Sequence, residues 1–199
     1  MIILLPPSEG KSSDVGGESF ASLNPEMVSD VAPVLEHLET LQGEAIGKFY
    51  GVKDAGKASL VHAMNLGAMD AGCVSALERY TGVVYGHLDY ASLRAKKRAA
   101  TRVYVVSGMF GLISGGMFIP PYKLPMNAWL RKYWVEKNTT GLRVLAKKSA
   151  VLSLLPQSYA KAVGLEDAVH VEFKVSGGKK LAGHFGKAIK GKFVRYLIE

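Results

Sequence analysis

The chain begins with an unbroken apolar run, Ile2–Leu5, which ends at two consecutive prolines. A run of this kind predicts a central strand that is covered on both faces of a sheet. In open α/β sheets, ligands bind just beyond the carboxyl ends of such strands. Ser8, Glu9 and Lys11 stand at this point, so we expect them to form one wall of a binding site.

Apolar residues further along the chain recur at helical spacing. After the helix-start signal Asn24-Pro25-Glu26, this spacing continues towards Gly43. Further helices are predicted over 45–50, 55–66, 90–100 and about 185–197. Strands are predicted over 103–106, 150–155 and 169–175, the last followed by a glycine turn at 177–178 and a return over 180–183. A length of 199 residues suits one domain, spanning 1–199.

A second group of polar residues follows the predicted strand 103–106. Ser107 opens a glycine-rich segment, and Tyr122 and Lys123 follow a second pair of prolines. Glycine allows a backbone to approach a ligand closely and to turn tightly. If the two strands are neighbours, both groups face one crevice; the alternative is two unrelated turns.

A third group lies on the predicted C-terminal helix. His184, Lys187 and Lys190 recur at three-residue intervals near its N-terminal end. The helix dipole favours anions at that end, so lysines there suit an anionic ligand better than they suit the helix itself. An ordinary amphipathic terminal helix is the alternative interpretation.

Charge supports an anionic partner. The chain carries 25 Lys and Arg against 17 Asp and Glu, a net charge of +8. Such a balance suits nucleic acid, a nucleotide or an acidic surface, although many proteins without such partners are equally basic. The basic residues concentrate in 94–102 and 174–195. We interpret the first of these segments as a solvated helix face.

Other residue types narrow the class of protein. The single cysteine, Cys73, has apolar neighbours and is expected to be a buried structural thiol. The five histidines lack the spacing of metal ligands, so neither a metal nor a cofactor is predicted. The sequence shows no signal peptide and no apolar stretch long enough to cross a membrane, so we expect a cytoplasmic protein without a membrane partner.

The segment Gly10-Lys11-Ser12 looks like the end of a nucleotide-binding P-loop. That motif needs a glycine where this chain has Leu5, and its backbone N–H groups are missing at the two prolines. No later predicted strand ends in the acidic magnesium ligand that such enzymes use. We therefore reject a P-loop nucleoside triphosphatase (NTPase).

Taken together, these motifs resemble the peroxide stress protein YaaA family along nearly the whole chain. The resemblance rests on residues that occur in the family's order and spacing: 6–12, Tyr80-Thr81-Gly82-Val83, Tyr85, 107–111, Pro120, Tyr122, Tyr159, His184, Lys187, Lys190, Gly191 and Arg195.

The resemblance implies a single α/β domain with a central mixed β-sheet wrapped by helices and a helix-hairpin-helix-like element. It also implies a basic cleft, lined by Lys11, Lys187 and Lys190, that binds duplex or branched DNA. Proteins of this family protect cells against hydrogen peroxide. Lysine contacts to phosphates fit such a cleft, because they supply affinity without reading bases.

The glycine-rich segment departs from the family pattern. Ser114-Gly115 and Met117 stand where the family usually has Arg-Pro and an acidic residue. Lys123 follows Tyr122 where the family usually has arginine, and lysine lacks arginine's bidentate geometry. Losing both members of an ion pair can be nearly neutral for folding, so these changes suggest altered function and not decay.

Two functions from different classes follow. The first is a DNA-binding stress protein whose nucleic-acid or phosphate contacts come from Ser8, Lys11, Lys123, His184, Lys187 and Lys190. The second is an enzyme acting on a nucleoside, nucleotide or nucleobase, with Glu9, Ser107 and Tyr122 as catalytic residues. In the second case Glu9 is a general acid/base or ribose ligand, and Tyr122 is a stacking partner or proton donor. A partner-binding domain without chemistry is a third possibility.

Overall fold

The computed structural model describes residues 1–166, 168–178, 181 and 183–199. Within these residues the main sheet has five strands in the order β4-β3-β1-β6-β7. β1 lies at the centre and pairs in parallel with β3 and β6; β7 continues the parallel pairing, and β4 runs antiparallel to β3. The strands are Ile2–Leu5 (β1), Val103–Ser107 (β3), Gly111–Ser114 (β4), Val151–Ser153 (β6) and Ala168–His170 (β7). This mixed α/β architecture confirms the predicted fold class.

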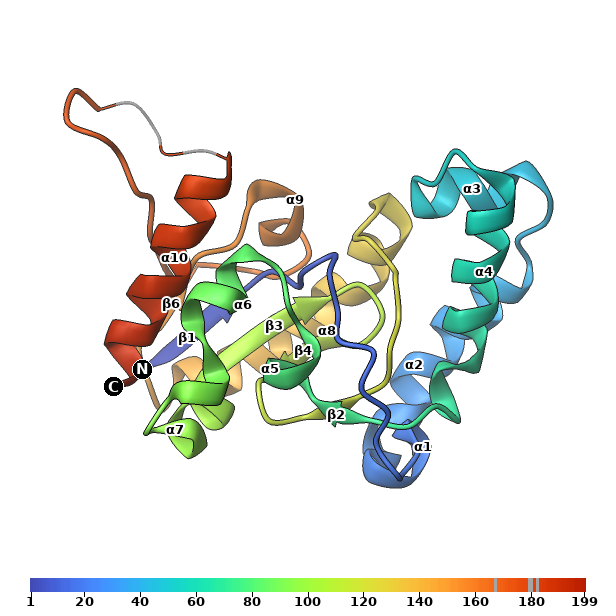
Figure 1. The fold of residues 1–199 in the computed structure, drawn as a ribbon, viewed down its shortest axis with the longest axis horizontal. Coiled ribbons are helices and arrows are strands. Elements are labelled where there is room, and N and C mark those ends of the chain that lie inside the picture. The colour runs from blue at the N-terminus through green and yellow to red at the C-terminus, as the bar shows by residue number, and fades with distance from the viewer. Residues whose placement is uncertain (167, 179–180, 182) are drawn as a thin grey trace.

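Helices surround the sheet (Figure 1). The longer ones are Pro25–Glu39 (α2), Glu44–Tyr50 (α3), Ala55–Leu66 (α4), Val83–Leu88 (α6), Lys96–Arg102 (α7), Ala128–Ala146 (α8) and Gly183–Ile198 (α10). Single turns are Phe20–Leu23 (α1), Ala76–Arg79 (α5), Gln157–Ala160 (α9) and the 3-10 turns Gly67–Met69 (η1) and Tyr90–Ser92 (η2). Strands Val74–Ser75 (β2) and Phe118–Ile119 (β5) form a small antiparallel sheet. In the described part of the chain, no helix is long and apolar enough to cross a membrane.

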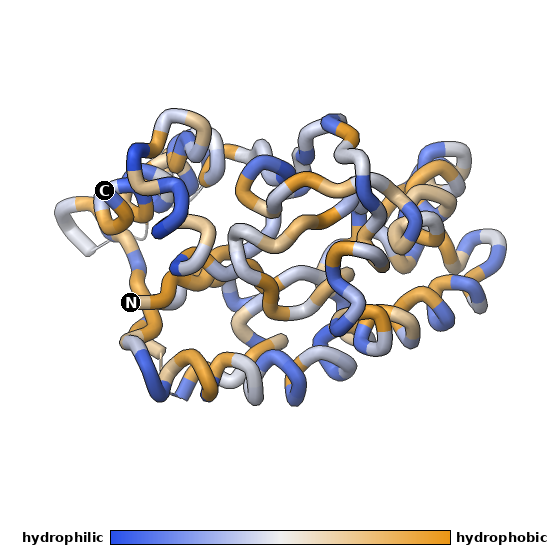
Figure 2. The backbone as a smooth tube through the Cα atoms, turned by 90° about the horizontal axis from the view of Figure 1, so that it is seen from below, coloured by the Kyte–Doolittle hydropathy of each residue, from blue (hydrophilic) through white to orange (hydrophobic). Residues whose placement is uncertain are grey.

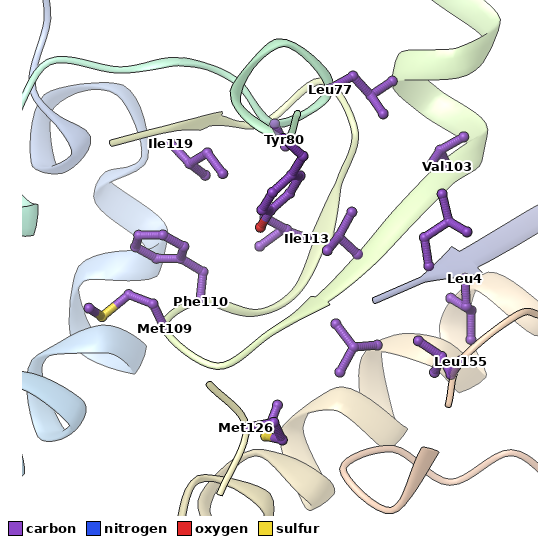
Figure 3. Close-up of a cluster of buried hydrophobic side chains, with 14 of the residues drawn as sticks. Leu4, Leu77, Tyr80, Val103, Met109, Phe110, Ile113, Ile119, Met126 and Leu155 are labelled. Atoms are coloured by element: carbon purple, nitrogen blue, oxygen red, sulfur yellow. The ribbon is translucent and has the colours of Figure 1, made fainter. Parts of the chain in front are cut away.

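The core lies on both faces of the main sheet. All four β1 residues are buried, as the opening apolar run predicts. Side chains from well-separated segments, including Leu4, Leu77 and Ile113, meet around the sheet (Figure 3). Hydrophobic and hydrophilic positions alternate along the outer helices (Figure 2), which is why each helix buries only one face.

Helices α3 and α4 form a helical hairpin, residues 44–66, at one side of the molecule (Figure 1). Both match the predicted helices at 45–50 and 55–66 to within one residue. Gly51 ends α3 in the left-handed conformation, at φ 68°, which glycine adopts without strain. The Asp54 carboxylate then accepts a 2.7 Å hydrogen bond from the backbone N–H of Lys57 and caps α4.

Helices α6 and α10 lie side by side at the other side of the molecule (Figure 1). Their closest approach is at Gly191, where a Cβ atom would stand 2.2 Å from the carbonyl oxygen of Val84. Arg195 lies one turn further on and donates hydrogen bonds to the Leu88 and Asp89 carbonyls at the end of α6. Gly191 and Arg195 therefore hold α6 and α10 together. This structural role accounts for the presence of both residues, and no ligand is needed to explain them.

We expect Gly191→Ala to lower the free energy of unfolding by about 2 kcal/mol, because the new methyl group forces α6 and α10 apart. Urea denaturation measures this change. Gly86→Ala is the matched control, since a Cβ atom at Gly86 in α6 has nothing within 4 Å. This control should be neutral or stabilising by up to about 1 kcal/mol. Equal losses in the two variants would refute the close helix contact.

The predicted helix 90–100 is wrong in its first half. Asp89 adopts a left-handed conformation and Leu93 is extended and buried, so a 3-10 turn and a bend precede α7. The predicted strand 169–175 shortens to three residues, because its partner β6 ends at Ser153 and offers no further pairing. The predicted return over 180–183 includes Lys180 and Ala182, which lie outside the described residues.

Candidate functional site

The parallel strands β1, β3 and β6 end at the same edge of the sheet, and the segments that follow them meet there. A cavity of about 250 Å³, here called the Lys11 cavity, lies beside the segment after β1. Its lining includes Ser8, Glu9, Lys11, Tyr122 and Lys123. The structure therefore brings the first predicted group together with Tyr122 and Lys123 of the second, whereas Ser107 is buried and does not line the cavity.

A second cavity of about 420 Å³, here called the Lys187 cavity, lies on the other side of the same segment. Lys187 and Lys190 line it, together with residues from the start of α6. Pro7, Ser8, Glu9 and Tyr159 line both cavities. The two cavities thus form one strand-end cleft, divided by the segment that carries Glu9.

The dividing segment is fixed against residues 80–82. Lys11 forms a β-bridge with Tyr80, and the backbone N–H of Thr81 donates to the Gly10 carbonyl at 3.1 Å. A Cβ atom at Gly82 would stand 2.6 Å from the Ser8 Cβ, so only glycine allows this approach. Ser8 directs its hydroxyl to the Gly10 carbonyl at 2.6 Å, which leaves Glu9 exposed at the wall between the cavities.

Lys11 is half-buried, whereas Lys123 and Lys187, two other lysines predicted to bind anions, are exposed. Its Nζ donates to the Ser8 carbonyl at 2.8 Å and lies 4.2 Å from the centre of the Tyr122 ring. Burial, reinforced by the positive charges of Lys123 and Arg79 and opposed by Glu9, lowers the pKa of Lys11 to about 8. Near pH 7 the protonated form still predominates, but the neutral fraction of this amine is far larger than that of an ordinary lysine.

This lowered pKa makes stability depend on pH. Between pH 8 and 10.5 the unfolded chain holds the Lys11 proton and the folded protein does not, so wild-type stability gains as the pH rises through this window. Lys11→Met lacks this titrating group. We therefore expect the unfolding free energy of wild type, relative to that of Lys11→Met, to increase as the pH rises from 8 to 10.5. Urea denaturation at several pH values tests this. A difference that stays constant, as we expect for the exposed control Lys132→Met, would contradict it.

A chain of buried hydroxyl groups lies behind Lys11. Ser107 Oγ accepts hydrogen bonds from the backbone N–H groups of Met109 and Phe110, each at 3.1 Å. With its acceptor sites used, Ser107 donates its own proton to the Tyr122 hydroxyl at 2.9 Å, and the Tyr80 hydroxyl lies 2.7 Å further along. Burial raises the pKa of both tyrosines, so they stay protonated. Tyr122 therefore offers the cleft its ring, while its hydroxyl is bound in the core.

Two buried polar residues that sequence reasoning missed support these groups. Arg79 is fully buried and donates to the carbonyls of Ser12, Asp14 and Ile119, which fixes the loop after Lys11. Asn65 donates to the Lys123 carbonyl at 2.9 Å and accepts from the Lys123 N–H at 2.8 Å. Asn65 thus ties the Tyr122–Lys123 loop to α4. For Asn65, a polar residue among apolar neighbours is a weak signal of such a role; Arg79 follows Glu78 and carries no comparable signal.

The α10 residues differ in their relation to the cleft. Lys187 is exposed at the Lys187 cavity, whereas Lys190 is half-buried and donates to the Leu154 carbonyl at 2.9 Å. His184 is exposed one turn before Lys187 and is not among the described residues that line the two cavities. The third predicted group therefore reaches the cleft through its lysines.

The residues that depart from the family pattern lie elsewhere. Ser114 pairs with Tyr104 near the amino end of β3, and the Gly115 N–H donates to the Val103 carbonyl at 2.7 Å. They therefore lie at the amino end of β3, whereas Ser107 lies at its carboxyl end, which is the end nearer the cleft. Ser114, Gly115 and Met117 therefore do not form the wall that faces Glu9. Lys123, the other residue that departs from the family pattern, does line the cleft.

The titratable residues of the cleft are Glu9, the four lysines and tyrosines such as Tyr159. Burial raises the pKa of Tyr159, and Glu9 adds to this increase. Among the described residues, no group of three or more His, Cys, Asp or Glu side chains could hold a metal ion. Chemically, the cleft offers cations for an anionic ligand, one exposed carboxylate and a partly neutral amine.

The fold defines a class of protein: a mixed α/β domain with a five-stranded sheet flanked by helices, here with a candidate site at the carboxyl edge of its parallel strands. The chain belongs to the family of the peroxide stress protein YaaA, since the model of that family matches residues 1–199. This confirms the family resemblance.

The chain is also similar to a UPF0246 protein of Streptomyces coelicolor, at 34% identity over 100% of this chain and 83% of that relative. A UPF0246 protein of Corynebacterium glutamicum is 29% identical over 99% of this chain and 84% of its own length. A third relative, from Maricaulis maris, is 24% identical over 100% of this chain and 83% of its own length.

Proposed function

We propose that this protein binds DNA through the strand-end cleft and thereby takes part in protection against peroxide. The observation that carries the proposal is the convergence of cations from separate elements on one cleft. Lys123 comes from the loop after β5, and Lys187 and Lys190 come from α10. Lysines spread in this way suit the repeated phosphates of a nucleic-acid backbone.

The α3–α4 hairpin extends this basic surface. Gly51 and Val52, at its turn, line the Lys11 cavity, so the hairpin borders the cleft directly. The exposed Lys53 follows in the same turn, and Lys48 lies on α3. Lys48 and Lys53 also line a hollow of about 860 Å³ on the hairpin. A DNA backbone that binds across the hairpin turn and the cleft could therefore use Lys53 together with Lys123 and Lys187.

The proposed contacts are to phosphates and not to bases. Lysine neutralises phosphate as a point charge and carries no sequence information in doing so. Such a site binds duplex or branched DNA without strong sequence preference. The family's description as a peroxide stress protein supports DNA as the partner, since DNA is a principal target of peroxide damage.

Fluorescence anisotropy with a labelled duplex and a labelled four-way junction tests the proposal. We expect binding at low salt. The logarithm of the binding constant should fall linearly with the logarithm of the salt concentration, because each neutralised phosphate releases counterions. Undetectable binding at about 50 mM salt, or binding that does not depend on salt, would refute it.

A second candidate function is an enzyme acting on a nucleoside, nucleotide or nucleobase. It is favoured by Glu9, an exposed carboxylate between two cavities of about 250 and 420 Å³, together the size of a small-molecule site. Here Glu9 is the general acid/base or a ribose ligand, and Lys187 binds phosphate. Ser107 and Tyr122 hold each other in place, with the Tyr122 ring as the surface on which a base stacks.

Thermal-shift screening with nucleosides, nucleotides and nucleobases tests this second function. A ligand that raises the melting temperature of wild type, and whose turnover is abolished in Glu9→Gln without loss of stability, supports it. Full turnover in Glu9→Gln would exclude Glu9 as the catalytic residue.

A further inference from the structure

We propose that Lys11 is a nucleophilic amine that forms a Schiff base with a small aldehyde or ketone bound in the Lys11 cavity. This inference does not depend on the identity of the partner that the outer cleft binds. It assigns Lys11 a chemical role in place of the phosphate contact expected from the sequence.

The first support is the placement of the amine. The Lys11 Nζ donates to the Ser8 carbonyl and lies 4.2 and 5.5 Å from the centres of the Tyr122 and Tyr80 rings, and these contacts fix the position of the nitrogen in the wall of the cavity. Among the described residues, no carboxylate lies within ion-pair distance of the Lys11 amine. A neutral amine can keep its hydrogen bond to Ser8 while its lone pair remains available to a ligand in the cavity.

The second support is the set of charges around the amine. Burial disfavours the ammonium form, and Lys123 and Arg79 add positive charge, whereas Glu9 alone opposes them. Tyr80, Tyr122 and Tyr159, the titratable tyrosines around it, stay neutral because burial raises their pKa. Desolvation and a neighbouring cation are the two means by which proteins activate a lysine for attack on a carbonyl.

The third support is the presence of a group that can move protons. Schiff-base formation begins when the neutral Lys11 nitrogen attacks the carbonyl carbon, and one N–H proton passes to the carbonyl oxygen to give a neutral carbinolamine. The nitrogen lone pair then forms the C=N bond while the hydroxyl group leaves as water with the second N–H proton, so amine and carbonyl give imine and water. Glu9 lines the same cavity and can relay these protons from nitrogen to oxygen. The step requires no oxidant or reductant.

Reductive trapping tests the proposal on the wild-type protein. Glycolaldehyde is the probe, because it is small enough for a cavity of about 250 Å³. Cyanoborohydride reduces the imine to a stable hydroxyethyl amine, and peptide mass spectrometry gives the labelling rate of each lysine. Near pH 7.5 we expect Lys11 to react at least about tenfold faster than exposed lysines such as Lys57 and Lys132, since far more of its amine is neutral than in an ordinary lysine.

The pH dependence separates reactivity from simple accessibility. The advantage of Lys11 should shrink as the pH approaches 10, where ordinary lysines also lose their protons. Lys11→Arg should remove this adduct and leave the other labelling rates unchanged. Labelling of Lys11 no faster than that of exposed lysines at pH 7.5, or an advantage that persists unchanged at pH 10, would overturn the proposal.

Discussion

The double variant Lys123→Gln/Lys187→Gln is expected to bind duplex DNA about 30-fold more weakly than wild type at physiological salt. Each lysine accounts for one phosphate contact, so the slope of log affinity against log salt should decrease by about 1.8. Both side chains are exposed, and Lys123 is held through its backbone by Asn65, so the substitutions leave the fold intact. Anisotropy titrations over a series of salt concentrations measure both effects.

A matched variant, Lys96→Gln/Lys97→Gln, controls for the loss of charge. These exposed lysines begin α7, which leads into the amino end of β3 and so lies at the edge of the sheet opposite to the cleft. We expect its affinity to stay within about threefold of wild type, because salt screens charges at such distances. Equal weakening in the two double variants would mean that the affinity for DNA depends on the net charge of the protein and not on contacts in the cleft.

Arg79→Met should lower the free energy of unfolding by about 3 kcal/mol, the largest effect on stability that we expect. The guanidinium is fully buried and donates to Ser12 and Asp14 at 2.7 and 2.8 Å and to Ile119 at 3.3 Å. Methionine fills a similar volume but leaves the buried Ile119 carbonyl and the part-buried Ser12 and Asp14 carbonyls without this donor. Urea denaturation gives the stability, and hydrogen exchange of residues 11–14 should report a looser loop.

Arg98→Met is the control for this substitution. Arg98 is exposed and donates to the Ile198 carbonyl, so we expect a change within about 0.5 kcal/mol. If Arg79→Met were as mild as this control, Arg79 would not be the residue that holds the loop behind Lys11.

Much of the cleft could be predicted because its elements have strong local signals. The apolar run of β1 and the two prolines after it indicate a buried strand and its end, and parallel strands then place Glu9 beside the residues after β3. The α3–α4 hairpin was equally clear, because Gly51 and Asp54 supply the stop and start signals that helices use.

The rest depended on tertiary contacts that leave no periodic pattern. Arg79 and Asn65 bond to carbonyl groups far away in the sequence, and sequence spacing gives no sign of such partners. The position of Ser114 at the far end of β3 follows from the register of an antiparallel pair, which one strand cannot reveal. For this reason the sequence alone does not show that the changed residues of the glycine-rich segment lie away from the cleft.

Hydrogen–deuterium exchange with and without duplex DNA tests the DNA-binding cleft most directly. We expect DNA to protect residues 6–11, the Tyr122–Lys123 loop and the first described turns of α10, and to leave α7 unchanged. Protection confined to α7, or no protection under conditions in which DNA is bound, would contradict it.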